Sequence, residues 1–147
     1  MNSEAFATAF GKVLRREKGL LCAAFFALLS SLFTSCGEVT PEQAASLAAK
    51  GFYQHLAEGA CEQFLEGKAG SDSLPEPYRE QLLTSCRQFL AQQQKLHQGI
   101  RDVSISNARR DTLTNFVSVF LMLNYGDSTR EEIVVPMVEH NGRWRMK

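Results

Sequence analysis

The sequence predicts an α+β fold in which N-terminal helices pack on a curved, four-stranded antiparallel meander. Apolar residues recur at helical spacing between residues 40 and 98, and from residue 100 onward the period changes to two. A helix-capping sequence stands at the start of the helical part, and Asn141-Gly142, a strong signal for a two-residue hairpin turn, stands near the end. Both ends of the domain are therefore marked by local sequence signals.

The leader precedes this domain and has the order of residues found in secretory signals. Four basic residues before residue 19 are followed by the uncharged run LLCAAFFALLSSLFTSC at 20–36. An uncleaved membrane helix is one alternative, because a span needs about 20 residues and 19–37 carries no charge. Ordinary secretion is the other alternative. Hydroxyl side chains in the distal half of the run weigh against a membrane span.

The segment Phe33-Thr34-Ser35-Cys36 resembles the lipobox of bacterial lipoprotein signals, where small residues precede a cysteine that receives palmitate and other acyl chains. The resemblance implies a signal peptide at 1–35, lipidation of Cys36 and a short tether at 36–39. Cys22 is a poorer candidate because two leucines precede it. We expect a cell-envelope protein anchored to a membrane, on the periplasmic or surface face of the outer membrane, with its domain held close to the bilayer.

Three helices are expected in the first half of the domain at 40–147. The sequence Thr-Pro-Glu-Gln at 40–43 forms a capping box with Thr40 as N-cap, and Gly59 supplies the stop. A short helix at about 61–66 follows, then a loop rich in turn formers at 67–77. The third helix ends near residue 98.

Four strands are expected after the helices, at about 100–109, 114–125, 131–140 and 143–147. A two-residue turn at 141–142 pairs Glu139 with Trp144 and places Pro136 opposite the final residue, Lys147. The missing amide of this proline then removes only the last hydrogen bond of the ladder.

The second strand is apolar on both faces, although one set of helices can cover only one of them. The other face, with Phe116, Phe120 and Met122, needs a helix, a partner protomer or a ligand. A homodimer formed through the sheet is one hypothesis.

The order of the elements and three short motifs resemble a known family. The motifs are Thr-Pro-Glu at 40–42, Phe52-Tyr53, and Asn-Gly-Arg-Trp at 141–144. They are similar to those of small Gram-negative bacterial lipoproteins of unknown function with a nuclear-transport-factor-2-like cone fold. The resemblance covers 40–147 and implies no catalytic residues, whereas the wider superfamily includes isomerases, dehydratases and proteins that only bind or assemble.

Composition excludes several functions. Twelve basic residues stand against fourteen acidic ones in 36–147, and no basic stripe is present, so we expect no nucleic-acid partner. The three histidines lack metal-ligand spacing, and we expect no metal and no cofactor. Cys61 and Cys86 form either a disulfide or two buried free thiols, and their positions in predicted helices favour the thiols.

Two classes of function stay open. In the preferred one, a non-catalytic cone binds a small apolar ligand, lined by Tyr53, Phe120 and Trp144, or the sheet binds a protein partner. The alternative is an isomerase- or hydrolase-like enzyme that uses Glu139 or His55. Glu139 is a candidate base because the neighbouring indole of Trp144 disfavours its charged form.

Overall fold

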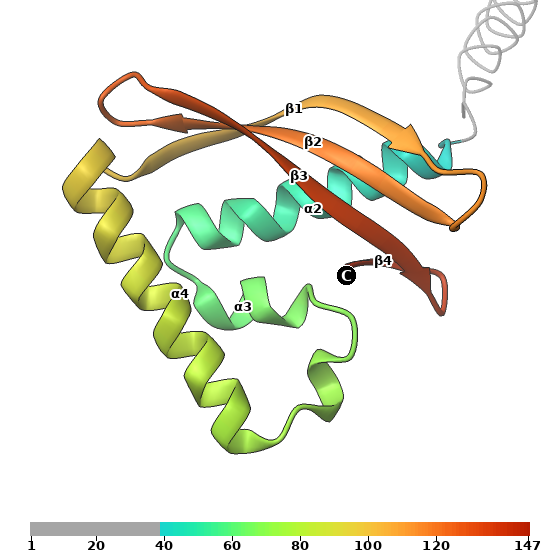
Figure 1. The fold of residues 1–147 in the computed structure, drawn as a ribbon, viewed down its shortest axis with the longest axis horizontal. Helices are drawn as coiled ribbons and strands as arrows, with labels where there is room; N and C mark the ends of the chain where they lie inside the picture. Colours follow the sequence, from blue (N-terminus) through green and yellow to red (C-terminus); the bar gives the residue numbers. More distant parts are fainter. Residues whose placement is uncertain (1–38) are drawn as a thin grey trace, which may run out of the picture. The chain divides into compact units, whose positions relative to one another are not determined.

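The computed structural model describes residues 39–147, and its elements follow the predicted order of helices and then strands (Figure 1). The elements are α2 (Pro41–Ala57), α3 (Cys61–Glu66), the 3-10 turn η2 (Ser71–Ser73), α4 (Glu76–His97), β1 (Ile100–Arg110), β2 (Phe116–Tyr125), β3 (Arg130–His140) and β4 (Arg143–Met146). The predicted signal peptide and Cys36 lie outside the described residues. Within 39–147, none of the helices combines the length and hydropathy that a membrane span requires.

The four strands form one antiparallel sheet in the order β1-β2-β3-β4, which confirms the predicted meander. The predicted register of the last hairpin is also found, with Glu139 opposite Trp144 and Met137 opposite Met146. The amide of Lys147 donates to the carbonyl of Pro136 at 2.9 Å. The amide that Pro136 lacks would therefore face only the final residue, as the sequence predicts.

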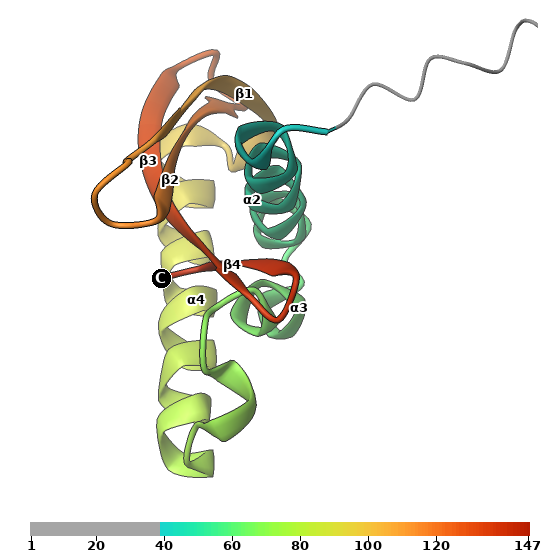
Figure 2. The same cartoon turned by 90° about the vertical axis from the view of Figure 1, so that its right-hand side faces the viewer.

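Helix α2 is positioned by its cap and by its small residues. The Thr40 hydroxyl accepts a hydrogen bond from the Gln43 amide at 3.3 Å, and the Gln43 side chain accepts one from the Thr40 amide at 3.1 Å. This is the predicted capping box. Ala45 and Ala49 are fully buried against the sheet, and their small side chains let the helix approach it closely. Figure 2 shows α2 running along one face of the sheet.

The face of β2 that meets α2 carries five buried residues, Val117, Val119, Leu121, Leu123 and Tyr125. A second, smaller cluster consists of Cys61, Leu65 and Leu83 and lies between α3 and α4. The described domain thus has two packed clusters, a main one under the sheet and a satellite one between the later helices.

The opposite face of the sheet is half-buried. The Arg109 guanidinium lies 5.7 Å from the centre of the Phe120 ring, and the Lys147 ammonium lies 4.1 Å from that of Phe116. Cationic side chains therefore cover part of this apolar face. Val134 on the neighbouring strand stays 55% exposed.

Candidate functional site

A cavity of about 470 Å³ lies between the core face of the sheet and the three helices. Leu123 and Ile133 contribute walls from the side of the main core, whereas Leu65 belongs to the satellite cluster. The cavity therefore occupies the space where the two clusters do not meet. Most of its wall is aliphatic or aromatic, and the polar exceptions are Tyr53, Lys68, Ser85 and Glu131.

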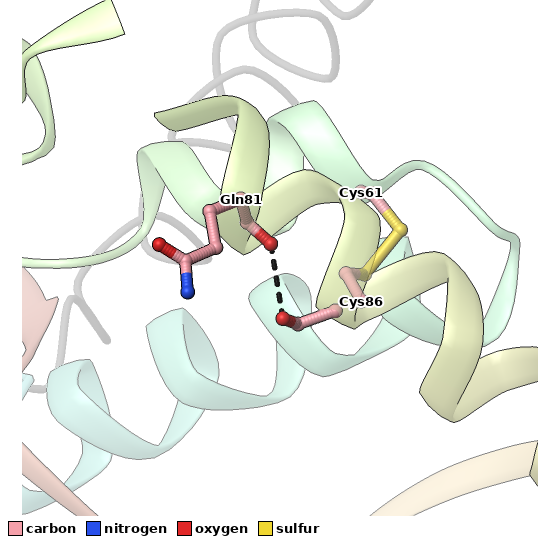
Figure 3. The surroundings of a disulfide bond; sticks show 4 residues. Cys61, Gln81 and Cys86 are labelled. Atoms are coloured by element: carbon pink, nitrogen blue, oxygen red, sulfur yellow. Dashed lines mark hydrogen bonds between the residues drawn. A yellow bond between two sulfur atoms is a disulfide. The ribbon is translucent and has the colours of Figure 1, made fainter. Parts of the chain in front are cut away.

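One wall of the cavity contains the Cys61 and Cys86 pair, which the structure joins in a disulfide with the two Cα atoms 6.0 Å apart. Figure 3 shows the bond linking the start of α3 to the middle of α4. The sequence favoured free thiols here, because helical spacing predicts that both cysteines face the core but does not predict that they meet. In the structure Cys61 is buried and Cys86 is half-buried. Beside the bond, the Ser85 hydroxyl donates to the Gln81 carbonyl at 2.9 Å (Figure 3).

Tyr53 is a polar group on the helical side of the cavity. Its ring packs edge-on against Phe64, with 5.4 Å between the ring centres. Burial raises the pKa of the Tyr53 phenol, so the group stays neutral at physiological pH. A neutral phenol beside apolar walls offers a ligand one hydrogen bond without a charge.

Glu131 supplies a carboxylate on the sheet side. It pairs with Leu123 across β2 and β3, which puts its side chain on the core face of the sheet. The Tyr125 hydroxyl donates to this carboxylate at 2.7 Å. Burial, followed by this bond to Glu131, raises the pKa of Tyr125 well above its usual value. The phenol therefore remains a donor and holds the carboxylate in place.

The three predicted ligand-binding residues do not come together. Tyr53 lines the cavity, whereas Trp144 lines a separate pocket of about 230 Å³ with Glu139 at another part of the sheet. Phe120 does not line this cavity: its neighbours Val119 and Leu121 are buried on the core face, so the alternation of β2 turns Phe120 to the opposite face.

The two predicted catalytic candidates also lie away from the cavity. His55 is in the last turn of α2, where its side chain is 46% exposed and 3.9 Å from the Glu58 carboxylate. Glu139 is exposed beside the β3–β4 turn. Neither contributes to the cavity wall. Sequence reasoning missed Lys68 and Glu131, although Glu131 had a signal: it alternates in step with Ile133 and Val135 and is the charged residue on their apolar face.

A second pair of titratable groups ties the end of α4 to the β2–β3 turn. The His97 Nδ1 atom lies 3.0 Å from the Asp127 carboxylate, and the Asp127 amide donates to the His97 carbonyl at 3.0 Å. Hydrogen bonds from the Thr129 hydroxyl and amide, together with His97, lower the pKa of Asp127 to about 2. The sequence placed His97 at a helix C-terminus but did not predict this contact.

Among residues 39–147, no group of three or more histidine, cysteine, aspartate or glutamate side chains is arranged to hold a metal ion. The chemistry available at the cavity therefore comes from one phenol, one ammonium, one hydroxyl and one carboxylate.

Comparisons with known proteins identify the fold of this domain. No family model matches the chain, and a search of the curated proteins finds no match. Among solved structures, the chain is similar to a Campylobacter jejuni protein named as a candidate NTF2-like transpeptidase, with a TM-score of 0.54 and 12% sequence identity. The match covers 67% of this chain and 92% of that chain. At this identity the likeness concerns the backbone alone, and it shows that the helices and the four-stranded antiparallel sheet form an α+β domain with the NTF2-like fold.

Proposed function

We propose that this chain is a membrane-anchored lipoprotein of the cell envelope whose cone is a non-catalytic binding domain for a small apolar ligand. The observation that carries the binding role is the cavity of about 470 Å³ with mainly apolar walls. Small-molecule sites typically measure about 300 to 1,000 Å³ and combine apolar walls with a few polar groups. This cavity has both properties.

The wall chemistry narrows the class of ligand. Phe64 and Phe89 offer aromatic surface, so the body of the ligand is apolar. The polar groups are few and of opposite charge, with Lys68 and Glu131 on different elements. A ligand with one polar end can pair that end with Lys68 or with Glu131, while its apolar body displaces water from the walls.

The anchoring part of the proposal is supported by the sequence. The basic residues, the apolar run and Cys36 stand in the order of a lipoprotein signal, and the N-cap of α2 at Thr40 follows closely. Replacing Cys36 with Ser should leave a full-length, unlipidated precursor, whereas a Cys22→Ser control should be processed normally. Radiolabelled palmitate and gel mobility measure both, and normal labelling of the Cys36 variant would show that the assignment is wrong.

The binding role is tested by filling the cavity. Ser85→Phe puts a large ring into the wall, and Thr84→Phe is the matched control on an exposed position of α4 outside the wall. Each full-length protein is purified in a non-ionic detergent of known mass and examined by native mass spectrometry. We expect wild type and the control to retain an additional apolar molecule and Ser85→Phe to lose it. Equal retention by all three contradicts the proposal.

A second candidate function is an isomerase- or hydrolase-like enzyme, and one observation favours it. Tyr53, Lys68 and Glu131 are three titratable groups in the wall of one cavity, and such convergence is common at catalytic sites. Glu131, rather than the predicted Glu139 or His55, would then be the base. If the chain is an enzyme, the Glu131→Gln variant should retain unreacted substrate, because it cannot convert it. The molecule that this variant retains should then differ in chromatography from the one retained by wild type.

We do not propose transpeptidation, the activity in the name of the Campylobacter jejuni protein, for this chain. Transpeptidation needs a nucleophilic side chain activated by a base. In the described cavity wall, Cys61 and Cys86 are bonded to each other, and the Ser85 hydroxyl donates to the Gln81 carbonyl.

A further inference from the structure

A second pocket, of about 480 Å³, opens between the loop after α3 and the β3–β4 hairpin, and its lining is mainly polar. Its charged and strongly polar lining residues are Lys68, Asp72, His140, Asn141, Arg143 and Arg145. Only Lys68 also lines the cone cavity. The second pocket is therefore a separate feature with a different chemistry.

Backbone hydrogen bonds hold the two walls of this pocket together. The Ala69 amide donates to the Met146 carbonyl at 2.7 Å, and the Met146 amide donates to the Gly67 carbonyl at 2.8 Å. The Arg145 guanidinium also donates to the Glu66 carbonyl, which anchors one cation of the pocket. The backbone that carries Lys68 and Arg145 is therefore held in place by hydrogen bonds between the loop and β4.

The charges of the pocket are unbalanced. Lys68, Arg143 and Arg145 bring three positive charges, and Asp72 brings one negative charge. Within the described part of the chain, the ion pairs involve His55 and His97, and none of these three cations has a carboxylate within ion-pair distance. Cations gathered around one concave site repel each other and raise the local concentration of anions.

We propose that this pocket binds a phosphate group carried by a hydroxyl-bearing molecule. Two guanidinium groups match phosphate oxygens through paired N–H donors, and Lys68 adds a point charge. The amide of Asn141 supplies a further donor. Asp72 accepts only, so it fits a hydroxyl next to the phosphate. Soluble phosphate esters and the headgroups of anionic lipids share this chemistry.

The site is tested on the full-length chain in a non-ionic detergent at low salt, because screening weakens such contacts. The probes are glycerol 3-phosphate and mixed micelles that contain phosphatidylglycerol, with phosphatidylcholine micelles as the uncharged reference. Backbone amide shifts at 68–73 and 141–145 report binding at the pocket, and calorimetry reports the affinity. Arg143→Gln removes a cation that lines this pocket and not the cone cavity, and Arg87→Gln on α4 is the matched control.

We expect the pocket amides to shift with at least one phosphate probe and Arg143→Gln to weaken that binding about tenfold or more, as loss of a charge-assisted contact predicts. The Arg87 control should bind like wild type. Shifts with glycerol 3-phosphate assign a soluble ester, and shifts with phosphatidylglycerol alone assign a headgroup. Unshifted pocket amides with both probes, or equal affinity of Arg143→Gln and wild type, overturn the proposal.

Discussion

The Tyr125 hydroxyl donates a hydrogen bond of 2.7 Å to the Glu131 carboxylate and so links the end of β2 to the wall of the cone cavity. The phenol is in the main core, and the carboxylate faces the space that the core leaves open. A buried donor thereby orients the charge that the cavity offers to a ligand. This relationship makes Tyr125 a positioning residue for Glu131.

Tyr125→Phe removes this hydrogen bond and keeps the ring. We expect it to lower the free energy of unfolding by about 1 kcal/mol, since the carboxylate can regain hydrogen bonds from water. Urea denaturation measures the change, and Tyr78→Phe on the exposed side of α4 is the control. A loss of the same size in both variants would mean that the bond to Glu131 contributes nothing.

The lowered pKa of Asp127 predicts a dependence of stability on pH. The folded value of about 2 is below the ordinary value of 3.8, so the folded state favours the ionised carboxylate. The resulting stabilisation is present above the ordinary pKa of 3.8 and is lost as the pH falls through the folded value of about 2. Denaturation curves between pH 5 and 2 should therefore fall more steeply for wild type than for Asp127→Asn, and parallel curves would contradict this explanation.

The Cys61 and Cys86 bond predicts a stability that depends on reductant. The bond closes a loop with a sequence separation of 25 residues. The chain-entropy model gives such a bond roughly 3 kcal/mol. We expect the Cys61→Ala, Cys86→Ala double variant to unfold at lower urea concentration than oxidised wild type, and reduced wild type to resemble the variant. A gel mobility that reductant leaves unchanged would instead support two free thiols.

The half-buried outer face of the sheet predicts self-association. Phe120, Met122 and Val134 lie there, with Arg109 covering only part of the surface. We propose a homodimer through this face, which Met122→Glu should dissociate because it buries an unpaired carboxylate. Size-exclusion chromatography with light scattering measures the mass, and Thr84→Glu on α4 is the control. A wild-type protein that scatters as a monomer at micromolar concentration would show that the prediction is wrong.

Local signals explain why much of the fold was predictable. The Asn141-Gly142 turn and the period of two determine the register of the last hairpin, because a slip of one residue would expose its apolar face. The capping box at Thr40 determines where α2 begins through contacts only three residues apart. Both signals act between near neighbours in the sequence, so they can be recognised without the fold.

The residues of the candidate sites were harder to predict, because these sites bring together residues that are far apart in the chain. Phe120 is an example. The alternation of β2 predicts which residues share a face with Phe120, but it does not predict which face of the sheet borders a cavity. Lys68 lies in a loop whose sequence has no period, and its position follows from pairing with β4.

The sequence by itself determined the order of helices and strands and the register of the last hairpin. It also predicts a lipoprotein leader that ends at Cys36. Only the tertiary structure decided that Cys61 meets Cys86, that Glu131 faces the cavity and that basic residues from a loop and a hairpin surround one pocket. The physical reason is the range of the interactions. Turns and caps are satisfied within a few residues, whereas cavities and charge clusters arise where separate elements fail to fill the space between them.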